Sequence, residues 1–249
     1  EIWDSIVNSA TIASFCRYYR ETYLAEDENL ETAFNNVMLM NNIFDTTRYN
    51  EDTTWSEEYS TDLNIIVESG ITLSIADNST IELLTNNKIV VVGNTIIGDN
   101  VTFLLNDSRS TIEVSNGLQI GQGVNFVNNS GEKSALIIRS STPVVINNAT
   151  FENCDIFIED SAFTLTNSNL SGSNVEQNRG VLTVSDCEFI ESSVNAFYTG
   201  TVVSTDAATI TNNDFQDCNY AAVSISSFPN FNVSGNFINN GETDAIVIT

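Results

Sequence analysis

The chain has no histidine and very few basic residues. Its 249 residues include eight Lys and Arg against 33 Asp and Glu, which gives a formal net charge of −25. Nucleic-acid binding depends on Lys and Arg that neutralise phosphates, and anionic lipid surfaces attract the same residues. We therefore expect neither nucleic acid nor an anionic membrane as a partner. The acidic residues are scattered, which predicts a soluble, self-repelling surface, with loose divalent-cation binding as the alternative.

Long apolar runs and closely spaced cysteines are also lacking. The sequence holds no run of about 18 apolar residues, so no membrane-spanning helix is predicted. Cys16, Cys154, Cys187 and Cys218 lie far apart without a CxxC pair, which argues against a zinc site. Four cysteines are also too few to identify a disulfide scaffold at this length. We expect no metal and no cofactor.

A short sequence pattern recurs in the second half of the chain, although the amino acid at each position varies between copies. Each unit has an apolar residue, a turn-forming residue two positions later, and a second apolar residue at the fifth position, or at the fourth in the last unit. The first apolar residues are Ile146, Leu165, Val184, Ile210 and Val233; the turn residues are Asn148, Asn167, Asp186, Asn212 and Gly235; the second apolar residues are Phe151, Leu170, Phe189, Phe215 and Phe237. Asn, Asp and Gly tolerate a left-handed backbone. Each unit therefore predicts two short strands joined by a one-residue corner with positive φ.

The spacing of the units indicates a solenoid. They recur every 19 to 26 residues, which is typical of one turn of a β-solenoid. A third strand is indicated in the last two units, where Val223 and Ile246 each stand 13 positions after the first apolar residue. Three short strands per turn, with inward Ile, Val, Leu and Phe stacked above one another, predict a parallel β-helix.

Two stretches resemble a known family. ATITNNDFQDCNYAAVSISSFPNFNVSGNFINN, residues 208–240, resembles the right-handed parallel β-helix repeat of the pectate-lyase-like superfamily. IIVESGITLSIADNSTIEL, residues 65–83, is similar to the N-terminal turns of many secreted β-helix proteins. The resemblance covers residues 63–249 and implies an all-β, right-handed parallel β-helix there. It is nearly silent on function, since the superfamily holds lyases, hydrolases, epimerases, tailspikes and adhesins.

Residues 1–62 follow a different pattern. Leu30, Phe34, Val37 and Met38 have helical spacing after an acidic stretch that suits a helix N-terminus. We expect a short, mainly helical segment that caps the first turn, because an open solenoid end leaves backbone donors and acceptors unpaired. A partner-binding segment is the alternative. The predicted division is residues 1–62 and 63–249.

The enzymes of this superfamily act on polysaccharides, and the resemblance directs attention to their catalytic groups. The polygalacturonase-like members need aspartates with a histidine, and the pectate-lyase-like members need calcium and an arginine base. Arg139 is the best candidate base, but it alternates outward from a predicted strand. Asp155, Glu159 and Asp160 could line one face, although surface solvation explains them better. We predict no catalytic residue and no enzyme, with lyase-like activity left open.

One turn exceeds the 19-residue minimum by seven residues, in or near NAFYTGTVVSTDA, residues 195–207. Such excursions often carry binding sites. Phe197 and Tyr198 could stack on a sugar ring or pack on a neighbouring protein, with Asp206 nearby. The alternative is an ordinary loop or an added strand that tucks its own aromatic ring down.

Asn-x-Ser/Thr sequons provide candidates for glycosylation in a eukaryotic secretory route. The candidates are Asn78, Asn100, Asn106, Asn128, Asn169 and Asn232. A seventh sequon, at Asn148, coincides with a predicted corner and would be a poor acceptor. Cys154 and Cys218 share one repeat position, which predicts stacked, buried free thiols.

The sequence favours an extracellular or cell-surface structural or adhesive protein. The apolar strand DAIVIT has no visible cap, so we expect self-association or contact with other surface proteins, for example in a filament. A carbohydrate-binding or polysaccharide-degrading β-helix is the alternative. Exposed aromatic rings on consecutive turns would favour the alternative, and inward, periodic rings would favour the structural protein.

Overall fold

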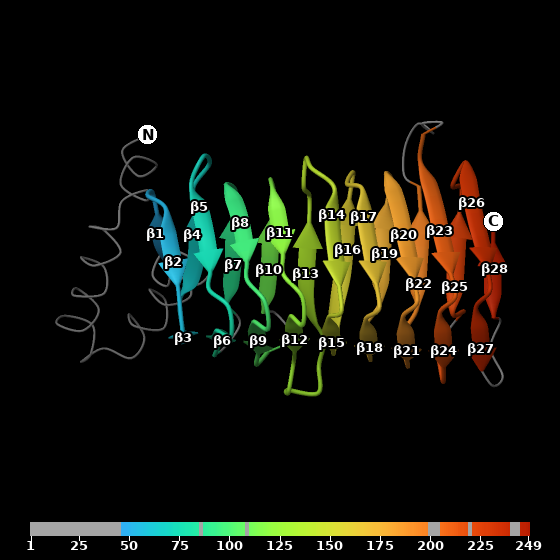
Figure 1. Ribbon diagram of the computed structural model, residues 1–249, viewed down its shortest axis with the longest axis horizontal. Helices are drawn as coiled ribbons and strands as arrows, with labels where there is room; N and C mark the ends of the chain where they lie inside the picture. Colours follow the sequence, from blue (N-terminus) through green and yellow to red (C-terminus); the bar gives the residue numbers. More distant parts are fainter. Residues whose placement is uncertain (1–45, 85–86, 108–109, 199–204, 219–220, 240–244) are drawn as a thin grey trace, which may run out of the picture.

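The computed structural model describes residues 46–84, 87–107, 110–198, 205–218, 221–239 and 245–249. Within these ranges the chain is all-β, with 28 strands and no helix. Every strand pairing is parallel, and the strands wind into an elongated solenoid (Figure 1). The predicted parallel β-helix is therefore confirmed for the described residues.

The strands form three walls. The ten-stranded wall contains, in order, β1 (Thr46–Tyr49), β4 (Asn64–Val67), β7 (Lys88–Val91), β10 (Thr111–Val114), β13 (Ser134–Ile138), β16 (Cys154–Glu159), β19 (Val175–Asn178), β22 (Val194–Phe197), β25 (Val223–Ser226) and β28 (Ile246–Ile248). The nine-stranded wall contains β3 (Glu58–Thr61), β6 (Thr80–Leu83), β9 (Thr102–Leu105), β12 (Asn125–Val127), β15 (Thr150–Glu152), β18 (Asn169–Ser171), β21 (Glu188–Ile190), β24 (Asp214–Gln216) and β27 (Phe237–Asn239).

The third wall, here called the split wall, consists of two sheets in line. The first holds β2 (Thr53–Trp55), β5 (Thr72–Ile75), β8 (Asn94–Ile97) and β11 (Leu118–Ile120). The second holds β14 (Val144–Asn147), β17 (Phe163–Thr166), β20 (Val181–Ser185), β23 (Ala207–Thr211) and β26 (Asn230–Ser234). The two sheets contact each other through β11 and β14. Parallel strands about 4.8 Å apart give the ten-stranded wall a length of about 43 Å.

The core consists of columns of identical or similar side chains that run along the solenoid axis. Alternate residues of each strand point inward, where Ile, Val, Leu and Phe are buried. Phe103, Phe126 and Phe151 stack with ring centroids 4.9 Å apart, and Phe189 stacks on Phe215 at 4.5 Å. These distances match the spacing of strands in a sheet. The register of the backbone therefore determines which side chains touch.

The predicted corners are confirmed at all five residues. The φ angles are 55° at Asn148, 49° at Asn167, 58° at Asp186, 57° at Asn212 and 69° at Gly235. A second series of positive-φ corners, which the sequence reading missed, follows the nine-stranded wall at Asn153, Gly172, Glu191 and Asp217. Each of these residues lies five positions after a residue of the first series. That constant offset was the available signal.

The last turn departs from the predicted register. Phe215 pairs with Ile238 rather than with Phe237. Because neighbouring residues of a strand face opposite sides, the one-residue change turns the side chain of Phe237 outward, where it is 64% exposed. The prediction that Phe237 continues the inward column is therefore wrong, and Ile238 takes that place. The shorter spacing in this unit is the cause.

The first turn begins earlier than the predicted boundary between residues 62 and 63. Strands β1, β2 and β3 belong to the three walls, so the solenoid includes residues from Thr46 onward. Trp55 stacks on Tyr59 with ring centroids 4.3 Å apart, and the hydroxyls of Tyr49 and Tyr59 lie 3.3 Å apart. Residues 1–45, with the helices expected there, lie outside the described residues.

We expect the corner backbone to select the residue at position 212. Asn212→Val places a β-branched residue at φ 57° and should lower the free energy of unfolding by about 1–2 kcal/mol. Asn212→Gly should cost less, because glycine adopts this conformation without steric penalty. Denaturant unfolding of both variants measures the difference. Equal losses would show that the positive φ does not determine this position.

We expect the aromatic column to be a main source of stability. Phe126→Ala removes a fully buried ring that stacks on two neighbours and should cost about 3–5 kcal/mol. Val145→Ala is the control, because this side chain is 55% exposed and its truncation should change stability by less than about 0.5 kcal/mol. Urea unfolding followed by circular dichroism compares them. Similar losses for the two variants would contradict a core built from these columns.

Candidate functional site

The predicted binding loop is only partly described, and its aromatic ring is turned towards the core. Phe197 ends β22, and the ring of the following Tyr198 makes an edge-to-face contact with Phe228 at 6.4 Å between centroids. Asp206 is 7% exposed, and its main-chain oxygen accepts a hydrogen bond from Asn230 at 3.1 Å. Residues 199–204 lie outside the described residues. This geometry favours the alternative in which the segment packs its own aromatic ring against the solenoid. Ligand binding by Phe197, Tyr198 and Asp206 stays a prediction.

The placement of the phenylalanine rings also favours packing of aromatic side chains in the core over a sugar-binding surface. The largest fully buried side chains are six phenylalanines on successive turns, Phe103, Phe126, Phe151, Phe163, Phe189 and Phe215. Among the described phenylalanines, the exposed ones are Phe231 at 48% and Phe237 at 64%, and both belong to the last turn. Inward, periodic rings are the pattern expected of a structural solenoid.

The candidate base Arg139 is held in a cluster of carboxylates on the ten-stranded wall. Its Nε donates to Glu159 at 2.6 Å, and its Nη1 donates to Glu113. The hydrogen bond with Glu159 is the main cause of a raised pKa at Arg139. A guanidinium with a raised pKa is a poorer general base, because it gives up its proton less readily. The geometry therefore gives Arg139 a structural role.

The acidic residues considered for catalysis also take part in ion pairs. Asp155 accepts from Lys133 at 3.0 Å, and Asp160 accepts from Arg179. Glu159 pairs with Arg139. Each pair is partly solvent-exposed, so its contribution to stability is small. These three carboxylates line the surface as charge partners.

A shallow groove lies at the corner between the split wall and the nine-stranded wall, near the end of the solenoid. Its volume is about 560 Å³, and its lining includes Asn167, Asp186, Glu188, Asn212, Asp214 and Phe237. Glu188 and Asp214 are neighbours in register on β21 and β24. Asp214 Oδ2 accepts from Gln216 at 3.2 Å, whereas Oδ1 has no partner. No group of three metal-ligating side chains occurs among the described residues. The groove presents carboxylate and amide groups beside one aromatic ring.

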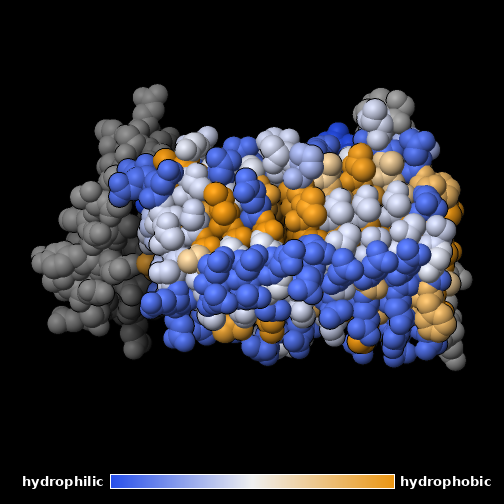
Figure 2. Space-filling model, in the orientation of Figure 1, coloured by the Kyte–Doolittle hydropathy of each residue, from blue (hydrophilic) through white to orange (hydrophobic). Residues whose placement is uncertain are grey.

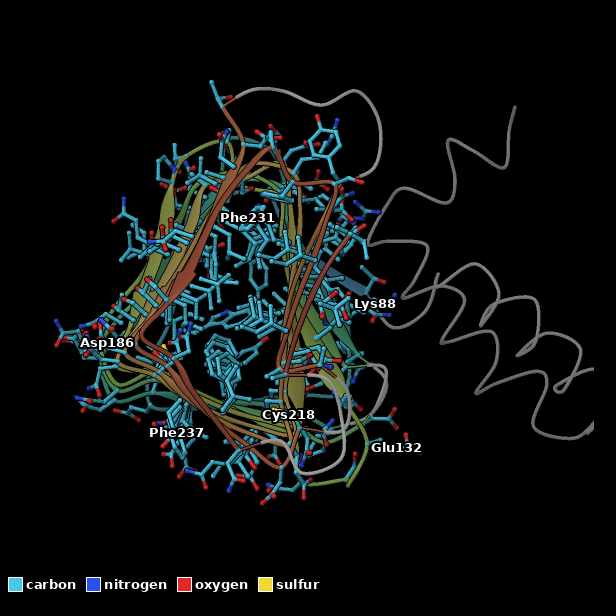
Figure 3. All side chains as sticks on the ribbon, turned by 90° about the vertical axis from the view of Figure 1, so that its right-hand side faces the viewer. Lys88, Glu132, Asp186, Cys218, Phe231 and Phe237 are labelled. Carbon is cyan, nitrogen blue, oxygen red and sulfur yellow. The ribbon has the colours of Figure 1, made fainter. Side chains whose placement is uncertain are left out.

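The last turn exposes an apolar end. Among the described residues, strands β26, β27 and β28 each pair with one neighbouring strand, so that no described strand covers their other edge. Phe231, Ile246 and Ile248 occupy inward register positions but are 48%, 43% and 50% exposed. Figure 3 looks onto this end and shows the three walls around the packed interior. The end combines unpaired strand groups with apolar side chains, which is a surface suited to pairing with another strand.

Cys154, Cys187 and Cys218 are buried and form no disulfide, as predicted for Cys154 and Cys218. Desolvation raises the pKa of Cys154 from 9.0 to about 12 and that of Cys187 to about 11, and it also raises the pKa of Cys218. Cys154 and Cys218 occupy one column but do not touch, because two serines lie between them. Cys154 N donates to Ser173 Oγ at 2.9 Å, and Ser173 N donates to Ser192 Oγ at 2.9 Å. Cys16 lies outside the described residues.

The six candidate glycosylation sites differ in exposure. Asn78 and Asn100 are exposed residues at positive-φ corners, and Asn169 and Asn232 are exposed on strands. Asn106 is half-buried and donates to Glu82 at 2.9 Å. Asn128 is fully buried, and its Nδ2 donates to the main-chain oxygen of Asp107 at 3.1 Å. This conformation leaves no room for a glycan on Asn128.

Comparison of this chain with known proteins found no match. No protein-family model matches the chain, and no curated protein or solved structure matches it significantly. No helix in the described part of the chain is long and apolar enough to cross a membrane.

Burial should make the thiols unreactive in the folded chain and make stability fall at high pH. Near pH 8, iodoacetamide should leave Cys154, Cys187 and Cys218 unlabelled until urea unfolds the chain, because the thiolate is the nucleophile. The pKa of Cys154 is higher in the folded chain than its unfolded value of 9.0. Its neutral thiol therefore contributes to the stability of the folded chain below pH 9, and this contribution is lost as the pH rises towards 12. Peptide mass spectrometry reads the labelling site by site. Rapid labelling of Cys154 in native buffer would contradict its burial.

Proposed function

We propose that this chain is a secreted or cell-surface structural or adhesive β-solenoid, of the right-handed, pectate-lyase-like type, that associates through its last turn. The exposed apolar side chains of that turn carry the proposal, because Phe231, Ile246 and Ile248 occupy inward register positions and are still exposed to solvent. Its partners are other copies of the chain or other surface proteins. Contact between unlike surfaces of successive copies would build a filament.

Charge supports this choice of surface. The chain has a formal net charge of −25, so two copies repel each other over most approaches. The last strands, with sequences NFNVS, FIN and IVI, contain no charged residue. An approach at this end avoids direct contact between carboxylates. It also buries apolar area, which favours association.

The mechanism is strand addition. An incoming strand pairs with the open edge of β26, β27 or β28 through main-chain hydrogen bonds, and its side chains cover the end of the core. The inward positions at this end continue the columns of Ala208, Val223 and Ile225. A partner with apolar residues at matching positions would therefore extend the same packing.

The superfamily type is supported by the repeat in its folded form. In the pattern Asn-x-x-Phe-x-x-Cys, Asn212 occupies a positive-φ corner, Phe215 is an inward column residue and Cys218 is buried. A second copy of the pattern, beginning at Asn148, has the same three roles. The resemblance therefore extends to the physical task of each position.

Carbohydrate binding is a second candidate function because of the corner groove. Asp214 and the neighbouring amides offer hydrogen-bond acceptors and donors to sugar hydroxyls, and Phe237 supplies one exposed ring. The binding site would then lie at this groove, rather than at the partly described loop.

Association can be tested by introducing one charged residue into the apolar surface of the last turn. The wild-type chain should form larger species as concentration rises, and Ile248→Asp should shift sedimentation towards the monomer because a carboxylate opposes burial. Val145→Asp, which changes a 55% exposed residue on the split wall, should associate like the wild type. Circular dichroism confirms that both variants fold.

A wild-type chain that stays monomeric at every concentration would contradict the proposal. So would equal association of wild type and Ile248→Asp. Polysaccharide binding by the monomer that is lost in Asp214→Asn would favour the second candidate.

A further inference from the structure

The split wall differs from the other two walls in charge. None of the residues in its nine strands is charged. The strands of the other walls carry eleven charged residues: Arg48, Glu58, Glu82, Lys88, Glu113, Glu152, Asp155, Glu159, Glu176, Glu188 and Asp214. In a chain with 33 acidic residues, a wall whose strands contain no charged residue indicates that charged side chains are unfavourable for the role of this surface.

The second sheet of this wall carries a two-row array of outward hydroxyl groups. Its central strands read Thr-x-Thr, Thr-x-Ser and Thr-x-Thr at Thr164, Thr183 and Thr209, and the residue between the two polar positions is buried in each case. The first row is Val145, Thr164, Thr183, Thr209 and Asn232, and the second is Asn147, Thr166, Ser185, Thr211 and Ser234. The pairings are in register along both rows.

The backbone fixes the spacing of this array. Neighbours in a row are about 4.8 Å apart, and the two rows are about 6.7 Å apart because two residues separate them along a strand. Threonine is restricted at χ1, so its methyl and hydroxyl groups are held in place with little entropy left to lose. The wall runs straight between the positions of Phe231 and Asp186 in Figure 3.

The face of the wall is exposed to solvent along the solenoid. In Figure 2 it faces the viewer, with white and orange side chains above a blue band. The blue band follows the corner marked by Asp186 in Figure 3. The uncharged face is therefore bordered on one side by a polar ridge that remains hydrated.

The composition of the array narrows the class of ligand. Stacking on sugar rings needs aromatic side chains, and β14, β17, β20, β23 and β26 have none at outward positions. A protein interface has an apolar centre with aromatic anchors, whereas the exposed large apolar groups at outward positions of this wall, Ile96, Val145 and Val181, are aliphatic and lie on separate strands. An ionic ligand would need charged groups. Regularly spaced hydroxyl and methyl groups fit an ordered lattice of water.

The dimensions agree with ice. Tetrahedral waters with O···O distances of about 2.75 Å place second neighbours about 4.5 Å apart and repeat every two layers at about 7.3 Å. The array of about 4.8 Å by about 6.7 Å lies within about 10% of both repeats. Its hydroxyls can take the places of lattice waters, and its methyl groups can lie in the hollows between them.

We propose that the split wall, centred on Thr164, Thr183 and Thr209, binds the surface of ice. The array runs along the side of the solenoid and reaches the last turn only at its end, at Asn232 and Ser234 on β26, so the inference, which is centred on β17, β20 and β23, does not depend on the proposed association. Adsorption through many weak, preorganised contacts accounts for specificity without a concave pocket.

The test combines nanolitre osmometry with partition of the purified chain into a growing ice crystal. The wild type should show a gap between melting and freezing temperatures and should be enriched in the ice fraction. Thr183→Lys places a long charged side chain at the centre of the array and should lose most of both effects. Thr209→Lys repeats the test one strand further along the wall.

Thr150→Lys is the matched control, since Thr150 is also an outward, half-buried residue of an interior strand but belongs to the nine-stranded wall. It should behave like the wild type, and circular dichroism should show all variants folded. A wild type without a freezing gap and without enrichment in ice overturns the proposal. So does an equal loss in Thr150→Lys and Thr183→Lys. If Thr183→Lys alters only sedimentation, the wall is a protein interface and the proposal is wrong.

Discussion

The parallel pairing of strands in successive turns, which is continuous along the ten-stranded and nine-stranded walls and interrupted between β11 and β14 on the split wall, is the interaction on which the rest of the structure depends. It fixes the distance between turns at about 4.8 Å and forces every turn to follow nearly the same path. Stacking of Phe103, Phe126 and Phe151 at 4.9 Å follows directly. So does the recurrence of positive-φ corners, because a corner that bent differently in one turn would break the pairing on either side of it.

The same constraint separates the surfaces of the molecule into walls and an end. On the walls the interior strands pair with a strand on each side, except at the break between β11 and β14, so that mainly the outward side chains decide what can bind. In the last described turn each strand pairs with a described strand on one side, and inward residues such as Phe231 and Ile248 are exposed. Charge follows this division: two walls carry charged residues in their strands, whereas the split wall and the last turn do not. The two proposals made for this chain, association at the end and adsorption on the split wall, use these two uncharged surfaces.

Much of the fold could be predicted from the sequence because corners restrict residue type. Asn148, Asn167 and Asp186 marked the corners correctly, since few residues tolerate a left-handed backbone. The second series, which includes Glu191 and Asp217, was missed because Glu is not a usual corner residue and interrupts the pattern of residue types, so that only the constant offset indicates the series. The shift at Phe237 and the early start at Thr46 required the strand register. The uncharged wall was invisible for the same reason, because its rows join residues about 20 positions apart in sequence. The catalytic and binding roles of individual residues could not be read from a repeat that specifies packing.

Hydrogen exchange followed by mass spectrometry at several protein concentrations tests the central claim most directly, that each turn is held by its neighbours and that the last described turn pairs with a described turn on one side. The account predicts strong, concentration-independent protection in interior strands such as β13 and β16, and weak protection in β26, β27 and β28 that increases as copies associate. Weak protection of the last turn at every concentration would contradict association at this end. Strong protection of the last turn in the dilute monomer would contradict the dependence of each turn on its neighbours.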